Sequence, residues 1–234
     1  MRDTVEPLES RSNLDTLNIF GAQLSMTSFK FLPRNLKVLQ IGCFGAASKT
    51  RFDANSLPPT LTEMSTTGVD YGARFEVLRE LPKHLTRLSI SGGDSPYYIV
   101  EPASSACILP QTLTYFSIDK LRIKNSYTDQ VGDCSGFFAN LPRGLLHLSV
   151  ELFTPYHACP ISCPDLVTLK LSYHHTSPPG TAGLGALLPR KLIVLDLVRA
   201  HTTLDFLPID DFRNLPRGLT DISFDTSIKL DLTP

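Results

Sequence analysis

One short phrase recurs along the chain and constrains the fold more than any single residue. It is a leucine and a proline followed by apolar residues three and then two positions apart, first seen as LPRNLKVLQI over residues 32–41. Copies of the phrase carry Pro33, Pro58, Pro82, Pro110, Pro142, Pro164, Pro189 and Pro216. These prolines lie about 26 residues apart on average, and self-similarity at such a period predicts a solenoid of stacked units.

The spacing of the apolar positions within each unit indicates a short strand. The second and third apolar residues, such as Leu39 and Ile41, are two positions apart and therefore point to the same side of an extended chain. The proline fixes φ and lacks an N–H, so a helix cannot run through it into the strand. Apolar pairs such as Phe138 and Leu141 predict single helical turns on the outer side, and the segment that best fits a true helix is residues 73–80.

These units resemble those of leucine-rich repeat proteins, in the variant that reads Leu-Pro-x-x-Leu-x-x-Leu-x-Leu. The resemblance covers about residues 10–228, including a weak unit with Thr66 in the third apolar position and a first copy without the proline at residues 14–19. It implies an α/β repeat fold, a curved solenoid with a parallel concave sheet of about nine short strands and an irregular or short-helical convex side. The whole chain, residues 1–234, is then a single domain, and the lack of evident polar caps also fits a fragment of a larger protein.

Composition indicates a soluble protein without a membrane span. Hydrophobic residues make up 42% of the chain, the formal net charge is −1, and no apolar run approaches the ~20 residues that cross a bilayer. The first residues do not resemble a signal peptide, and the five cysteines do not form a disulfide framework. We therefore expect an intracellular, cytoplasmic protein. The near-zero charge also argues against a nucleic-acid partner.

One group of residues could hold a metal ion or support hydrolysis. His157, Cys159, Cys163 and His174 offer nitrogen and sulfur ligands of the kind that bind zinc. However, Cys163 precedes Pro164 and would take the leucine position of the phrase, where a small buried side chain is expected. No nucleophile elbow or phosphate-binding loop is present. The sequence therefore predicts a protein that is not an enzyme and has no cofactor or metal, with this cluster as an alternative.

Basic residues follow several of the prolines. They are Arg34, Lys83, Arg143, Arg190 and Arg217, and stacking the units would align them along one edge. Such a row could attract an acidic partner. The simpler interpretation is that they are solvated turn residues.

The residues that flank the second apolar position of each strand face away from the core. Those just before it are Val38, Glu63, Arg87, Tyr115, His147, Thr168, Val194 and Asp221, and those just after it are Gln40, Ser65, Ser89, Ser117, Ser149, Lys170, Asp196 and Ser223. Arg87, Tyr115 and His147 are large side chains next to small serines, and Arg and Tyr are common in binding hot spots. The predicted partner-binding residues of the concave face are Arg87, Tyr115, His147, Glu63, Lys170, Asp196 and Asp221.

The expected size of this face suits a protein partner. Parallel strands about 4.8 Å apart, each exposing about five residues, give an inner surface on the order of 650 Å². A standard protein interface takes about 800 Å² from each partner, and the insertions at residues 91–108 and 119–140 are expected to add loops. We therefore predict a non-catalytic protein-binding module whose partner the sequence does not identify. The family resemblance also allows the substrate-recognition part of a ubiquitin ligase.

Overall fold

The protein is a row of parallel strands in which each repeat contributes one strand to a single sheet. The computed structural model describes residues 13–20, 30–42, 56–67, 78, 81–91, 97–100, 109–124, 135–152, 160–173, 187–199 and 214–224. The strands are β1 (Thr16–Phe20), β2 (Val38–Gly42), β3 (Glu63–Thr67), β4 (Arg87–Ser91), β5 (Tyr97–Val100), β6 (Tyr115–Lys124), β7 (His147–Leu152), β8 (Thr168–Tyr173), β9 (Val194–Arg199) and β10 (Asp221–Phe224).

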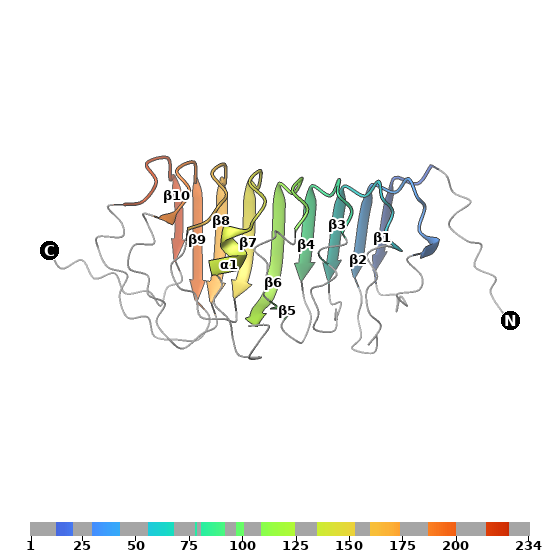
Figure 1. Ribbon diagram of the computed structural model, residues 1–234, viewed down its shortest axis with the longest axis horizontal. Coiled ribbons are helices and arrows are strands. Elements are labelled where there is room, and N and C mark those ends of the chain that lie inside the picture. The colour runs from blue at the N-terminus through green and yellow to red at the C-terminus, as the bar shows by residue number, and fades with distance from the viewer. Residues whose placement is uncertain are drawn as a thin grey trace.

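The strands follow one another in chain order and point the same way (Figure 1). Within the described residues the order is β1-β2-β3-β4-β6-β7-β8-β9-β10, with β5 paired to β6 outside this path. The predicted solenoid of about nine short parallel strands is therefore confirmed. The unit with Thr66 and the first copy without the proline both supply strands, β3 and β1.

Equivalent residues of successive repeats lie opposite each other, so each position of the repeat forms a straight row across the sheet. Leu39 pairs with Met64, Met64 with Leu88, and Leu88 with Phe116. The rows of first, second and third apolar positions are buried along most of the sheet. Because the strand period is two, the residues between the second and third rows face away from this core.

The proline of the phrase begins a tight turn just before most of the strands. The N–H of Leu36 donates to the carbonyl of Pro33 at 3.1 Å, and the same bond recurs between Leu192 and Pro189. Leu32 and Leu36 are buried on either side of the turn while Arg34 is exposed. The phrase therefore places two leucines in the core and one solvated residue at the edge of the sheet where the strands begin.

Cys163 departs from the predicted alignment. The N–H of Leu166 donates to the carbonyl of Cys163 at 3.2 Å, which is the bond that a proline carbonyl accepts in the other repeats. Cys163 therefore stands at the proline position, and its assignment to the leucine position was wrong. The physical reason is that one residue, rather than two, separates Pro164 from Leu166. Its predicted burial is confirmed, because Cys163 is 0% exposed.

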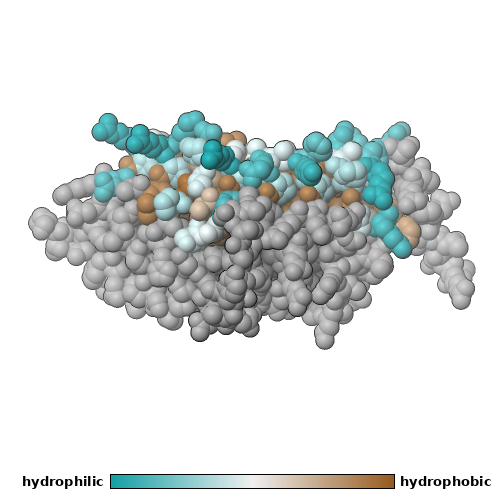
Figure 2. Space-filling model, in the orientation of Figure 1, coloured by the Kyte–Doolittle hydropathy of each residue, from teal (hydrophilic) through white to brown (hydrophobic). Residues whose placement is uncertain are grey.

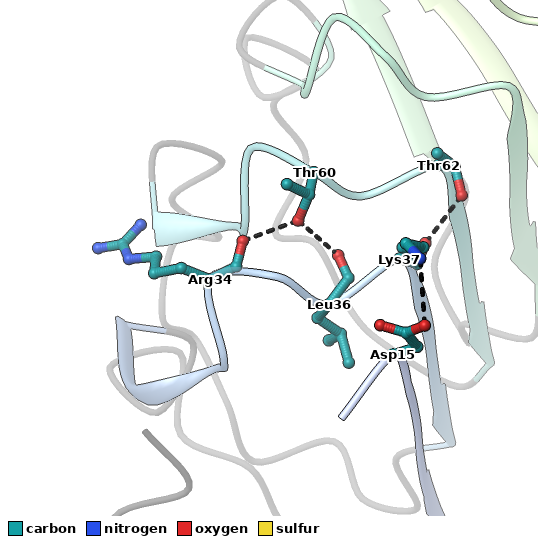
Figure 3. Close-up of polar contacts among 6 residues, drawn as sticks. All are labelled: Asp15, Arg34, Leu36, Lys37, Thr60 and Thr62. Carbon is teal, nitrogen blue, oxygen red and sulfur yellow. Dashed lines mark hydrogen bonds and ion pairs between the residues drawn. The ribbon is translucent and has the colours of Figure 1, made fainter. Parts of the chain in front are cut away.

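Hydrogen bonds between repeats form a second ladder at the edge where the strands begin. The carbonyl of Lys37 accepts from the N–H groups of Thr62 (2.8 Å) and Glu63 (3.0 Å), and this pattern recurs in each following repeat of the described part. The hydroxyl of Thr60 lies 2.7 Å from the carbonyl oxygen of Arg34 and 2.9 Å from that of Leu36 (Figure 3). These bonds tie each turn to the one before it.

The outer side contains little helix in the described part of the chain. It includes the α-helix α1 (Ser135–Ala139), in which Phe137 and Phe138 are buried with ring centroids 5.3 Å apart. This agrees with the expected irregular or short-helical outer side. Of the helix predicted over residues 73–80, only Leu78 is described, in a 3₁₀ turn. Across the described residues no helix is long and apolar enough to cross a membrane.

The two insertions expected as loops contribute strand structure. Tyr97–Val100 forms β5, and β6 extends to Lys124, so that Tyr97 pairs with Leu121 and Val100 with Lys124. Tyr97–Val100 contains two tyrosines and two β-branched residues, and the extension of β6 contains Ile123; such residues favour strands. The extension of β6 follows a shift in register between Ile118 and Leu121 relative to β7.

Candidate binding surface on the sheet

The candidate site is the side of the sheet that faces away from the core, here named the open face. Its first row, the face row, consists of Val38, Glu63, Arg87, Tyr115, His147, Thr168, Val194 and Asp221. Its second row, the serine row, consists of Gln40, Ser65, Ser89, Ser117, Ser149, Lys170, Asp196 and Ser223. Both rows have the alignment that the sequence predicted.

Three residues of the face row stack on one another across β4, β6 and β7. The guanidinium carbon of Arg87 lies 3.7 Å from the centroid of the Tyr115 ring, within the range of a cation–π contact. The rings of Tyr115 and His147 are 6.0 Å apart and tilted by 42°. Arg87 is exposed, and the two rings are half-buried. We call these three residues the central stack.

The serine row gives the central stack a flat and hydroxylated surround. Ser89, Ser117 and Ser149 are half-buried residues on the three strands that carry the stack, and Ser117 pairs with both of the others. Their small side chains leave the faces and edges of the larger neighbours accessible. The surface in this region therefore combines large aromatic and cationic side chains with the hydroxyl groups of the neighbouring serines.

The remaining predicted site residues are charged and lie on both sides of the central stack. Lys170 and Asp196 form an ion pair of 3.1 Å between β8 and β9. Glu63, on β3, is the register neighbour of Arg87, and Asp221 lies on β10. Both acidic residues are exposed, and neither forms an ion pair with another described residue. All seven predicted residues thus share the open face, and their role in binding stays a prediction.

Sequence reasoning missed exposed apolar residues on and beside this face. Phe20 is 65% exposed and lies over Gly42, at which an added Cβ would come 2.6 Å from the Phe20 ring. Leu146 and Ile193 are also exposed. Each lies directly before the face-row residue that begins its strand. The sequence could have indicated their exposure, because none of these three residues occupies one of the apolar positions of the repeat that form the core.

The metal-site alternative finds one of its four residues in the described part of the chain. Cys163 is buried, and its thiol donates to the carbonyl of Pro142 at 3.3 Å. His157, Cys159 and His174 lie outside the described residues. Among the residues that the structure describes, there is no group of three or more His, Cys, Asp or Glu that could hold a metal ion.

Comparisons with known proteins address the fold. No protein-family model matches the chain, and no curated protein matches it. A solved structure that does match is CroV588, described as a novel circular leucine-rich repeat protein, with a TM-score of 0.53 and 19% identity. The match covers 97% of this chain and 32% of that chain, so this chain spans about a third of that protein's length. The recurring phrase, the parallel rows and this likeness together show that the chain has the leucine-rich repeat fold.

Proposed function

We propose that the chain is a non-catalytic scaffold inside the cell that binds another protein on its open face, with the central stack at the middle of the interface. The observation that carries the proposal is the contact of Arg87, Tyr115 and His147 across three strands. Leucine-rich repeats and other solenoids present extended surfaces of this kind for binding. The intracellular location is an expectation from the sequence.

The central stack has the physical properties of a binding anchor. Long side chains usually lose conformational freedom when a partner immobilises them, at a cost of about 0.5–1.5 kcal/mol each. Arg87 already lies over the Tyr115 ring, and Tyr115 contacts His147. Part of the conformational freedom of these side chains is therefore lost before a partner binds. Arg and Tyr also combine a large contact area with directed hydrogen bonds, which explains their frequency in hot spots.

The surroundings of the stack resemble the rim of a protein interface. Interfaces commonly have a central cluster of aromatic and Arg side chains with polar and charged groups around it. Here Glu63 lies on one side of the stack, and the Lys170–Asp196 pair lies on the other. These charges favour partners with complementary groups and disfavour others, so they add specificity more than affinity.

Capture of a partner by variants of the stack tests the proposal. The immobilised chain would be used to bind proteins from its native cell, and the bound proteins would be compared between the original chain and the variant Arg87→Glu with Tyr115→Ala. We expect the variant to lose a bound protein while its thermal unfolding stays nearly unchanged, because both residues lie outside the core.

The chain offers a matched control in a second cation–π pair away from the open face. Lys30 lies 4.9 Å from the centroid of the Phe31 ring in the turn before Leu32, and both residues are exposed. The variant Lys30→Glu with Phe31→Ala removes the same kinds of group and should retain capture. Undiminished capture by the stack variant, or equal loss in the control, would contradict the proposal.

A further inference from the structure

A row of cations follows the edge where the strands begin. The residue two positions before the first core leucine is Arg34, Pro59, Lys83, Gln111, Arg143, Pro164, Arg190 and Arg217 in successive repeats. The five basic residues of this cationic row are exposed. Figure 2 shows hydrophilic residues along this edge, with hydrophobic residues visible among them toward the C-terminal side.

Two of the described acidic residues at this edge have basic partners, whereas Glu63 and Asp221, the first residues of β3 and β10, form no ion pair with a described residue. Asp15 pairs with Lys37 at 3.1 Å, and Asp165 pairs with Lys191. Within the described residues, no member of the cationic row forms an ion pair. Because the whole chain has a net charge of −1, this edge is positive relative to the rest of the molecule. It therefore favours a partner with negative charge.

A second row, three residues after the cationic row, changes its chemistry halfway along the sheet. We name it the edge row, and it consists of Lys37, Thr62, Thr86, Thr114, Leu146, Val167, Ile193 and Thr220. The hydroxyls of Thr62, Thr86 and Thr114 donate to the edge-row carbonyl of the preceding repeat, at 3.1, 3.1 and 3.2 Å. Threonine at this position thus adds a hydrogen bond between repeats.

Three consecutive repeats replace that threonine with an aliphatic residue. Leu146, Val167 and Ile193 cannot form the hydroxyl bond, and Leu146 and Ile193 are 36% and 42% exposed. Strand propensity does not explain Leu146, because Thr is β-branched and Leu is not. The replacements remove an inter-repeat bond and expose apolar surface, which is expected where a partner covers that surface.

The cations and the aliphatic residues lie on the same stretch of the edge. Arg143 precedes Leu146 by three residues before β7, and Arg190 precedes Ile193 by three residues before β9. We infer that the edge beside β7 to β10 binds an acidic protein segment with aliphatic side chains, a second surface independent of the open face. Its carboxylates bind Arg143, Arg190 and Arg217, and its aliphatic groups cover the exposed edge row.

The exposed aliphatic residues suit a protein better than a nucleic acid. Arg143 and Arg190 stand two strands apart, about 10 Å, whereas residues i and i+2 or i and i+4 of an extended segment, which share a side, are about 7 or 13 Å apart. Arginine forms two parallel hydrogen bonds with a carboxylate or a phosphate, so the exposed Leu146 and Ile193 are the residues that favour a peptide with aliphatic side chains. Single-stranded nucleic acids are usually held by aromatic stacking, and neither described row contains an aromatic residue.

Fluorescence anisotropy with a labelled peptide of Asp, Glu and Leu tests the inference at low ionic strength. Two further probes are the same peptide with each Leu replaced by Ser, and a single-stranded oligonucleotide of similar length. We expect the Leu-containing peptide to bind most tightly and to weaken as salt increases. Tighter binding of the oligonucleotide, or equal binding of the Ser peptide, would overturn the inference.

Restoring the threonine pattern gives a variant that separates binding from folding. In Leu146→Thr with Ile193→Thr, the new hydroxyls can donate to the carbonyls of Thr114 and Val167, as the native threonines do to theirs. Stability should be equal or higher, while peptide binding should weaken about tenfold. Unchanged binding in this stable variant would overturn the inference.

Charge variants provide the matched comparison. Arg143→Gln with Arg190→Gln should weaken peptide binding about tenfold, whereas Arg34→Gln with Lys83→Gln, made in the threonine half of the edge, should weaken it about twofold or less. Equal losses in the two variants would show a diffuse charge effect and contradict the assigned stretch. Arg87→Glu with Tyr115→Ala changes the net charge by the same amount as Arg34→Gln with Lys83→Gln and should likewise weaken peptide binding about twofold or less, so failure of this inference and failure of the open-face proposal are distinguishable.

Discussion

The substitution Thr66→Val should stabilise the protein. Thr66 is 1% exposed, and its hydroxyl has no hydrogen-bond partner among the described residues. It stands in the third core row, where its neighbours in register are Ile41 and Ile90. Valine has nearly the same shape as threonine without the hydroxyl, so the change removes a buried polar group and leaves the packing intact.

The expected gain follows from the cost of burying a hydroxyl without a partner. Mutational data place that cost at about 1–3 kcal/mol, and a chain of this size gains about 2–4 °C in Tm per kcal/mol. Urea unfolding followed by circular dichroism should show a higher midpoint with an unchanged slope. Thr66→Ile should raise the free energy of unfolding by less than the burial of its additional methylene would give, because the added volume strains the third core row.

The same substitution at Thr86 supplies the control. Its hydroxyl donates to the carbonyl of Thr62 at 3.1 Å, so Thr86→Val removes a made hydrogen bond and should cost about 0.5–1.5 kcal/mol. The two Thr→Val changes are therefore expected to have opposite signs. A loss of stability in Thr66→Val equal to that in Thr86→Val would refute the reasoning, because it would mean that the Thr66 hydroxyl is satisfied.

Three further substitutions test the packing of the repeats. Thr112→Val should cost about 0.5–1.5 kcal/mol in urea unfolding, because the one hydroxyl proton is shared between the carbonyl of Lys83 at 2.7 Å and that of Leu85 at 2.8 Å. Phe138→Ala should cost about 3–5 kcal/mol by the same measurement, since that ring is 0% exposed; a loss below 1 kcal/mol would show that α1 does not close the core. As a single substitution, Gly42→Ala should destabilise the protein, because the new Cβ meets the Phe20 ring. In a Phe20→Ala background the same substitution should be stabilising, and a double-mutant cycle should give a coupling energy of about 0.5–1 kcal/mol.

The sequence predicted the rows well because the core positions recur with fixed spacing inside each repeat. The alignment of Arg87, Tyr115 and His147 required only that equivalent residues lie opposite one another, and their register confirms it. Their mutual contact was not predicted, although side chains in neighbouring repeats about 4.8 Å apart must touch when they are this large. The binding role of these residues depends on the partner, and the repeat pattern carries no information about the partner.

The predictions that differed from the structure concerned residues outside the fixed spacing. Cys163 was misplaced because the sequence alignment was anchored on Pro164. The turn is instead defined by the hydrogen bond from the N–H of Leu166 to the carbonyl three residues before it, which belongs to Cys163. β5 lies in an insertion without the repeat phrase, so periodicity gave no signal for it. The change from Thr114 to Leu146 in the edge row was visible in the sequence, but its meaning depends on the hydroxyl bonds that the structure shows.

The most direct test of the central claim, that the open face binds a protein through the central stack, is hydroxyl-radical footprinting with and without the captured partner. The account predicts that the partner lowers oxidation of Tyr115 and His147 together, while Phe31, which is 47% exposed in the turn before Leu32, remains as reactive as before. Unchanged oxidation of Tyr115 and His147 in the saturated complex would contradict the account.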